Sequence, residues 1–218
     1  MKISNCDALI FDLDGTLYNK KKIAFFTMMQ QWRHLRILSV SNKRRGELKG
    51  VDFGDSVLYY QNFYNSIGEE LSLSVETVKD WYINTFYRGF IGILEQRYSA
   101  RKNLKTLLEH IDKEFPMAVF SDYAFVEERL RALEIDDSLF SVISHSEEYG
   151  VLKPSARPLL DLSLKMGVSA DRTLVVGDRV DTDGEAALKA GMMFYHVDSE
   201  DKWDQFSKEM HKYIEMRG

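Results

Sequence analysis

The amino-acid sequence predicts an α/β fold, a doubly wound parallel sheet with an inserted α-helical region. Three observations lead to this prediction. The chain opens with a short apolar run that ends in two carboxylates, a pattern typical of a buried strand in a parallel sheet. From Tyr98 onward, strand-like and helix-like patterns alternate, which implies parallel strands joined by right-handed crossovers. Between these parts, residues 21–99 show helical periodicity and no strand-like alternation.

The length of 218 residues predicts one globular domain with an additional segment, and the apolar and charged fractions are those of an ordinary globular protein. The net charge of −5 gives no electrostatic case for nucleic acid as a partner. No stretch is apolar enough to span a membrane, and the first residues lack the apolar core of a secretory signal. The single cysteine, Cys6, excludes an internal disulfide and is interpreted as a strand-entry residue. We therefore expect a cytoplasmic protein without nucleic-acid or membrane partners, and its oligomeric state stays open.

The opening stretch covers Ala8 to Leu17, with the sequence Ala-Leu-Ile-Phe-Asp-Leu-Asp-Gly-Thr-Leu, and is interpreted as a buried strand that ends in the two carboxylates. Asp12 and Asp14 would share a face of an extended strand, but Gly15 favours a sharp turn that lets Asp14 lean over Asp12. Two carboxylates at close range need a counter-ion or a shared proton, because each raises the pKa of the other. A divalent metal ion would satisfy both. The alternative interpretation is an ordinary Asp-Gly turn after a strand.

The region after this strand predicts a small helical bundle. Apolar residues recur at spacings of three and four, and the stripe of the first helix contains Phe25, Phe26, Met29, Trp32 and Leu35. The predicted elements are a helix over 23–38, a polar and basic loop over 41–54, and helices over 55–71 and 74–90. Ser74 is a plausible N-cap. We interpret the aromatic stripes as a helix core, and the basic run Lys43 to Arg45 as a solvated loop.

The second half of the chain predicts the rest of the sheet. The predicted strands cover 117–121, 142–143, 173–178 and 194–197. Helices are expected over 102–114, 124–133, 156–166 and 184–190, followed by a polar terminal helix. Pro116, Gly167 and Gly191 mark boundaries between these elements. The run that ends in Asp178 repeats the opening pattern, an apolar strand that leads into an aspartate.

Four short motifs follow predicted strands, and together they resemble those of the haloacid dehalogenase-like (HAD) hydrolases. Phe-Asp-Leu-Asp-Gly-Thr-Leu at residues 11–17 resembles the first motif, and Ser121 in Val-Phe-Ser-Asp resembles the second. Lys153 in Gly-Val-Leu-Lys-Pro resembles the third, and Gly-Asp-Arg-Val-Asp-Thr-Asp at residues 177–183 resembles the fourth. The likeness continues to Lys-Ala-Gly-Met at residues 189–192.

Each motif alone also has a simpler explanation. Ser121 could be a turn hydroxyl at a strand end, and Lys153 could be a loop lysine beside a proline. Either Asp181 or Asp183 could cap the helix that starts near Gly184. The occurrence of all four motifs together favours the resemblance. Each follows a predicted strand, and the carboxyl ends of parallel strands bring active-site residues together at one edge of a sheet.

The resemblance implies a role for each matching residue. Asp12 would be the nucleophile and form an aspartyl-phosphate, and Asp14 would act as general acid and base. The residues implied in phosphate binding are Ser121, Lys153 and Thr16, the last of which would also stabilise the loop that carries Asp14. The residues implied in binding Mg²⁺ are Asp12, Asp14 through its backbone carbonyl, Asp178 and Asp183. Whether Asp181 or Asp183 lies closer to the metal stays open.

The implied activity is that of a Mg²⁺-dependent phosphatase acting on a small phosphorylated metabolite. HAD dehalogenases lack an acidic residue at the position of Asp14, so its presence favours phosphate chemistry. The resemblance also implies a core over 1–20 and 100–218 and a helical cap of the C1 type over 21–99, where the substrate would be recognised. Candidate lining residues of the cap are Phe25, Phe26, Trp32, Arg33, Arg44 and Arg45. A phosphomutase acting on a sugar phosphate and a non-catalytic binding protein are the alternative functions.

Overall fold

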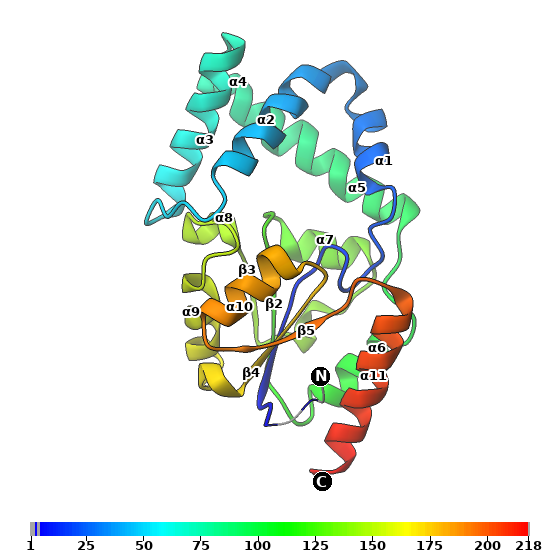
Figure 1. The fold of residues 1–218 in the computed structure, drawn as a ribbon. Coiled ribbons are helices and arrows are strands. Elements are labelled where there is room, and N and C mark those ends of the chain that lie inside the picture. The colour runs from blue at the N-terminus through cyan, green and yellow to red at the C-terminus, as the bar shows by residue number, and fades with distance from the viewer. Residues whose placement is uncertain (1–2, 4, 218) are drawn as a thin grey trace.

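A parallel five-stranded sheet lies at the centre of the protein, in the order β3-β2-β1-β4-β5 (Figure 1). The computed structural model describes residues 3 and 5–217. The strands are β1 (Ala8–Phe11), β2 (Met117–Ser121), β3 (Val142–His145), β4 (Thr173–Gly177) and β5 (Met193–His196). β1 pairs with β2 on one side and with β4 on the other, and all four strand pairs are parallel. The first strand is therefore the central one, between the strands that lead to Ser121 and Asp178.

Helices cover both faces of this sheet, which confirms the doubly wound fold. One face packs against α6 (Leu104–Ile111), α7 (Val126–Ala132) and α11 (Glu200–Glu215), and the other against α9 (Arg157–Lys165) and α10 (Glu185–Lys189). Leu9 and Phe11 belong to the first core and Ile10 to the second, because successive strand side chains point to opposite faces. The short helix α8 (Ser146–Tyr149) follows β3. No helix in the described part of the chain is long and apolar enough to cross a bilayer.

Residues 23–97 form a helical insertion beyond the carboxyl ends of the strands (Figure 1). It contains α1 (Ile23–Gln30), a 3₁₀ turn (Trp32–His34), α2 (Leu35–Glu47), α3 (Ser56–Leu71), α4 (Val75–Asp80), a π-helical turn (Trp81–Tyr87) and α5 (Arg88–Arg97). Its own core contains Tyr59, Phe63, Trp81, Tyr82 and Phe86, which confirms an aromatic helix core for the segments predicted over 55–90 but not for the first predicted helix. Ser74 caps α4 by accepting a hydrogen bond from the Thr77 amide, as predicted, but the helix predicted to end near residue 90 continues to Arg97.

The single helix predicted over 23–38 is wrong. The helix stops at Gln30 and a new one begins at Leu35. Gln31 explains the break, since its buried side chain accepts a hydrogen bond from Trp81 Nε1 (3.2 Å) and donates one to the Thr85 carbonyl (3.0 Å). The predicted apolar stripe is mostly exposed: Phe25, Met29, Trp32 and Leu35 have 51%, 57%, 63% and 46% of their surface accessible. The helical periodicity of residues 23–38 shows that these residues share an apolar face, but it cannot show whether another part of the protein packs against that face.

The loop predicted over 41–54 is also wrong in its first half. α2 continues through Lys43, Arg44 and Arg45 to Glu47, because lysine and arginine are good helix formers. Arg45 is buried and forms an ion pair with Glu147, which is buried as well. Its charge is therefore neutralised inside the protein rather than solvated.

Candidate active site

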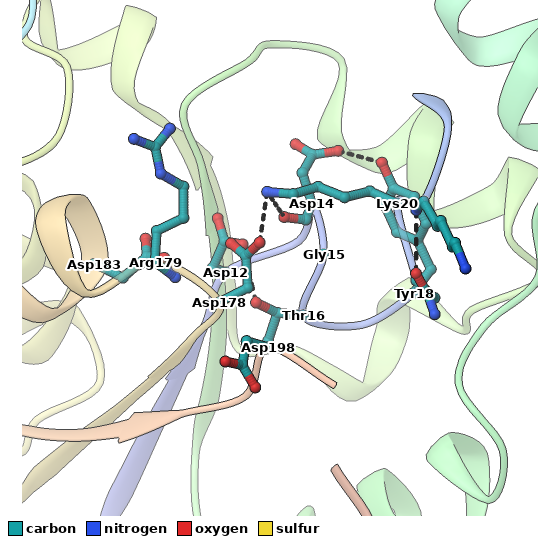
Figure 2. Close-up of polar contacts among 12 residues, drawn as sticks. Asp12, Asp14, Gly15, Thr16, Tyr18, Lys20, Asp178, Arg179, Asp183 and Asp198 are labelled. Atoms are coloured by element: carbon teal, nitrogen blue, oxygen red, sulfur yellow. Dashed lines mark hydrogen bonds and ion pairs between the residues drawn. The ribbon is translucent and has the colours of Figure 1, made fainter. Parts of the chain in front are cut away.

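The carboxyl ends of β1, β2 and β4 bring the predicted site residues to one edge of the sheet. Asp12 follows β1, and its amide donates a 2.9 Å hydrogen bond to the Val176 carbonyl of β4. Ser121 ends β2 and Asp178 follows β4. One pocket contains Asp12, Asp14, Lys153, Asp178 and Asp183 among its lining residues. Figure 2 shows Asp12 beside Asp178, while the Asp14 carboxylate is turned away from them toward Tyr18.

Asp12 is held through both of its carboxylate oxygens. Oδ1 accepts a hydrogen bond from Lys153 Nζ (2.7 Å) and Oδ2 accepts one from Thr16 Oγ1 (3.0 Å). Burial raises the pKa of Asp12 to about 8, and the neighbouring carboxylates act in the same direction while Lys153 opposes them. Thr16 therefore orients Asp12 in this structure, in keeping with a loop-stabilising role. Burial is the main cause of the raised pKa, and Asp14, Asp178 and Asp183 add negative charge that a further cation would neutralise.

Lys153 uses all three of its ammonium protons. Besides Asp12, it donates to Asp183 Oδ1 (2.8 Å) and to the Phe120 carbonyl (3.0 Å). Burial lowers the pKa of this group, but the charges of Asp12 and Asp183 outweigh burial and raise it above its ordinary value. Lys153 is thus a fixed positive charge between two carboxylates.

Asp14 has a different environment from Asp12. Its Oδ1 accepts a hydrogen bond from the Tyr18 hydroxyl (2.6 Å), and its Oδ2 accepts one from Ser121 Oγ (3.1 Å) and forms an ion pair with Arg129. Burial acts to raise the pKa of Asp14, but the Arg129 guanidinium and the Tyr18 hydrogen bond outweigh it, so the pKa lies below its usual value. The two carboxylates of the opening motif are therefore distinguished by their partners.

Arg129 is a residue of this site that the sequence interpretation missed. It is fully buried in α7, and its Nη1 also donates to Ser121 Oγ (3.0 Å) and to the Tyr123 carbonyl (3.0 Å). Arg129 lies among other charged residues of its helix, and an arginine in such a segment is ordinarily expected to be exposed. No local sequence signal therefore points to it as a site residue. Tyr18 and Lys20 were missed too, although both follow the opening motif closely.

The acidic residues of the site form a donor set suited to a divalent cation. Carboxylate oxygens of Asp12, Asp178 and Asp183 all lie within 4.8 Å of one another. The Lys20 ammonium lies between the Asp14 carbonyl oxygen (3.0 Å) and Asp178 Oδ2 (2.5 Å), as Figure 2 shows. These oxygens thus already bind one cation, and hard oxygen donors of this kind are those that Mg²⁺ prefers. The residues present fit the metal.

Asp183 belongs to this donor set, whereas Asp181 does not. Asp183 is buried, and its Oδ2 accepts a hydrogen bond from the Arg179 amide (3.1 Å). Asp181 is exposed and pairs with the Arg179 side chain at 2.6 Å. Of the two aspartates that the sequence left open, Asp183 is thus the one that lies in the acidic cluster.

A cavity of about 320 Å³ lies above Asp14, between the core and the helical insertion. The insertion contributes mainly apolar side chains to it, namely Ile23, Ala24, Leu38, Phe86 and Phe90, together with Thr27 and Asn42. The core side contributes Asp14, Tyr18, Lys20, Tyr123 and Arg179. The candidates Phe25, Phe26, Trp32, Arg33 and Arg44 are not among the lining residues of this cavity, and Arg45 lines an adjacent pocket.

Several known proteins resemble this chain over most of its length. A glyceraldehyde 3-phosphate phosphatase from Methanocaldococcus jannaschii is 26% identical over 204 residues, which cover 87% of this chain and 83% of that protein. Two solved structures share the fold. A 2-haloacid dehalogenase from Pseudomonas syringae has a TM-score of 0.66 at 17% identity, covering 95% of this chain and 99% of that one. A β-phosphoglucomutase from Clostridium difficile has a TM-score of 0.64 at 17% identity, covering 96% and 99%.

The family is shown by a match along most of the sequence. The model of the haloacid dehalogenase-like hydrolases matches residues 9–197. This range begins in β1 and passes β5, so it contains all four motifs and the whole helical insertion. The chain therefore belongs to the haloacid dehalogenase-like hydrolases.

Proposed function

We propose that this protein is a Mg²⁺-dependent phosphatase that hydrolyses a small phosphate monoester through a phosphorylated Asp12. The observation that supports it best is the pair of carboxylates, buried Asp12 and partly buried Asp14, that one short turn presents to the same pocket with different partners. The roles require an ionised Asp12 and a protonated Asp14, which is the reverse of their pKa directions in this structure. The proposal therefore requires bound Mg²⁺ to favour the ionised form of Asp12, and Asp14 to take up a proton as its contact with Arg129 loosens.

In this proposal Asp12 attacks phosphorus and the ester oxygen leaves. Lys153 and Thr16 hold the two oxygens of Asp12, which fixes the direction in which the carboxylate faces the phosphoryl group. The Lys153 ammonium and the Ser121 hydroxyl would balance the negative charge of the phosphoryl oxygens. Ser121 donates to Asp14 in this structure, so binding of phosphate would redirect its proton.

Asp14 would protonate the leaving oxygen and later take a proton from the water that hydrolyses phosphorylated Asp12. Its carboxylate lines both the pocket that contains Asp12 and the cavity above it, so it lies between the proposed nucleophile and the proposed position of the leaving group. Arg129 contacts both Asp14 and Ser121 and would act as a positioning residue for them.

The donor set described above would hold Mg²⁺ through the Asp12 and Asp178 carboxylates and the Asp14 carbonyl, with Asp183 beside them. When bound, Mg²⁺ supplies positive charge to phosphoryl oxygens in the transition state. The same charge would favour the ionised form of Asp12, whose pKa burial raises.

The helical insertion would act as a cap of the C1 type that encloses the leaving group. The 320 Å³ cavity beneath it sets the scale of that group, and the M. jannaschii relative is named for a three-carbon phosphate. The lining itself is mixed, since Thr27, Asn42 and Tyr123 could bind hydroxyls beside the apolar side chains of the insertion. The volume of the cavity and the name of the M. jannaschii relative favour hydrolysis of a small ester over a sugar phosphomutase, although the C. difficile relative in fold is a mutase.

The test is release of phosphate from p-nitrophenyl phosphate and from a panel of phosphorylated three- and four-carbon acids, aldehydes and hexoses, with and without Mg²⁺. Turnover that needs Mg²⁺ and is fastest for the small esters is expected. A phosphomutase would instead convert one sugar phosphate into its isomer and release phosphate slowly. A non-catalytic binding protein would release none from any of them.

A further inference from the structure

We propose that Lys20 is a tethered counter-ion of the metal site, and that Mg²⁺ binds only by displacing its ammonium group. This inference rests on the metal site of the proposed function and adds a residue that the four motifs do not contain. In this proposal the Lys20 ammonium and Mg²⁺ compete for the same oxygen atoms and do not bind side by side.

The first support is the position of the ammonium. Lys20 Nζ lies 2.5 Å from Asp178 Oδ2 and 3.0 Å from the Asp14 carbonyl oxygen, which are two of the oxygens proposed to bind the metal. Mg²⁺ binds oxygen at about 2.0–2.1 Å. An ion bound to both oxygens and an ammonium bound to the same two would occupy nearly the same volume and repel each other, so only one can be present.

The loop is shaped to allow this contact. Gly15 has a φ of +95°, and a Cβ at this position would lie 2.3 Å from Asp178 Oδ2 and 2.9 Å from Lys20 Cε. The missing side chain thus makes room for Lys20 and Asp178 to meet across the turn (Figure 2).

Lys20 can leave this position, whereas Lys153 cannot. Lys153 is buried and its three protons are taken by two carboxylates and a carbonyl. The Lys20 side chain is 36% exposed, follows a loop and borders the 320 Å³ cavity. A displaced ammonium would therefore enter the cavity where the leaving group is proposed to bind, beside Arg179.

Lysine labelling of the wild-type protein tests this exchange directly. Limited acetylation with and without saturating Mg²⁺ is read at each lysine by mass spectrometry, with the exposed neighbours Lys21 and Lys22 as internal controls. We expect Mg²⁺ to increase labelling of Lys20 several-fold and to leave Lys21 and Lys22 unchanged, because an ammonium released from Asp178 becomes free to react. Unchanged or reduced labelling of Lys20 would overturn the proposal.

Calorimetric titration with Mg²⁺ supplies a second readout, using Lys20→Met and the matched control Lys21→Met. Removal of a charge-assisted contact that the metal must break predicts about ten-fold tighter Mg²⁺ binding by Lys20→Met, and wild-type affinity for Lys21→Met. Equal or weaker binding by Lys20→Met, with wild-type Mg²⁺ binding intact, would overturn the role of Lys20 alone. Lack of Mg²⁺ binding by all three proteins would overturn the metal site as well.

Discussion

Arg45 of the helical insertion and Glu147 of the core form an ion pair in which both side chains are buried. Glu147 also accepts hydrogen bonds from the hydroxyls of Tyr60 (2.6 Å), Tyr82 (2.7 Å) and Tyr87 (3.0 Å). One carboxylate from α8 is thus enclosed by side chains of α2, α3 and the π-helical turn. This network fastens the insertion to the core on the side away from α1.

Replacement of Glu147 should therefore destabilise the whole protein. Glu147→Gln keeps the volume but leaves Arg45 as an uncompensated buried charge, which costs about 3–5 kcal/mol. At this chain length, such a loss lowers the melting temperature by roughly 6–20 °C. The measurement is thermal unfolding followed by circular dichroism. Glu127→Gln, an exposed carboxylate on α7, is the control and should melt like the wild type; equal melting of both variants would contradict the proposed anchor.

The sequence could predict the sheet and the motif residues because their signals are local. Each strand is an apolar run, and the residue that follows it must lie at the carboxyl edge of a parallel sheet. Asp12, Ser121 and Asp178 converge for that reason alone. Lys153 lies outside any strand, and only its match to a family motif pointed to it.

The partners of these residues could not be predicted because they depend on packing between distant segments. Arg45, Arg129 and Lys20 are cations on helices or loops, where solvation is the ordinary expectation. Each is instead paired with a carboxylate that lies at least 100 positions away along the chain, and the Lys20–Asp178 pair is the most distant of the three. Phe25 shows the reverse error, since helical periodicity cannot tell whether an apolar face is covered.

Cys6 should be unreactive in the folded protein. Its side chain is fully buried, and burial raises the pKa of the thiol to about 12. Since the thiolate is the reactive form, iodoacetamide at pH 9 should label Cys6 only after unfolding. Mass spectrometry of native and denaturant-unfolded protein measures this. Rapid labelling of the native protein would show that the thiol is accessible and ionised, contrary to its interpretation as a strand-entry residue.

Removal of the metal should abolish turnover. EDTA is expected to stop hydrolysis of p-nitrophenyl phosphate and excess Mg²⁺ to restore it, because no side chain of the pocket replaces a divalent charge. Asp178→Asn should weaken Mg²⁺ binding by at least about 100-fold, since loss of even an outer partner of a metal costs about 10–100-fold. Asp181→Asn, a nearby exposed aspartate, should bind Mg²⁺ like the wild type. Full activity in metal-free buffer would refute the site.

Asp12→Asn should prevent formation of the phosphorylated enzyme. The amide nearly preserves the volume of the carboxylate but is not a nucleophile. Incubation with a ³²P-labelled substrate, followed by an acid quench, should leave the variant unlabelled and the wild type transiently labelled. Label at another residue of the variant would show that Asp12 is not the nucleophile.

Asp14→Asn should affect phosphorylation of Asp12 and hydrolysis of the phosphorylated enzyme differently, and the effect on phosphorylation should depend on the leaving group. An alkyl phosphate expels a strongly basic alkoxide that needs a proton, so the variant should lose almost all activity on it. The p-nitrophenolate group leaves without a proton, so phosphorylation of Asp12 by p-nitrophenyl phosphate should be slowed less. Hydrolysis of the intermediate would then lag, because the attacking water has lost its base, and labelled enzyme should accumulate with p-nitrophenyl phosphate. Single-turnover labelling with both substrates measures this. Equal losses of activity for Asp12→Asn and Asp14→Asn with every leaving group would mean that the roles assigned to the two carboxylates are wrong.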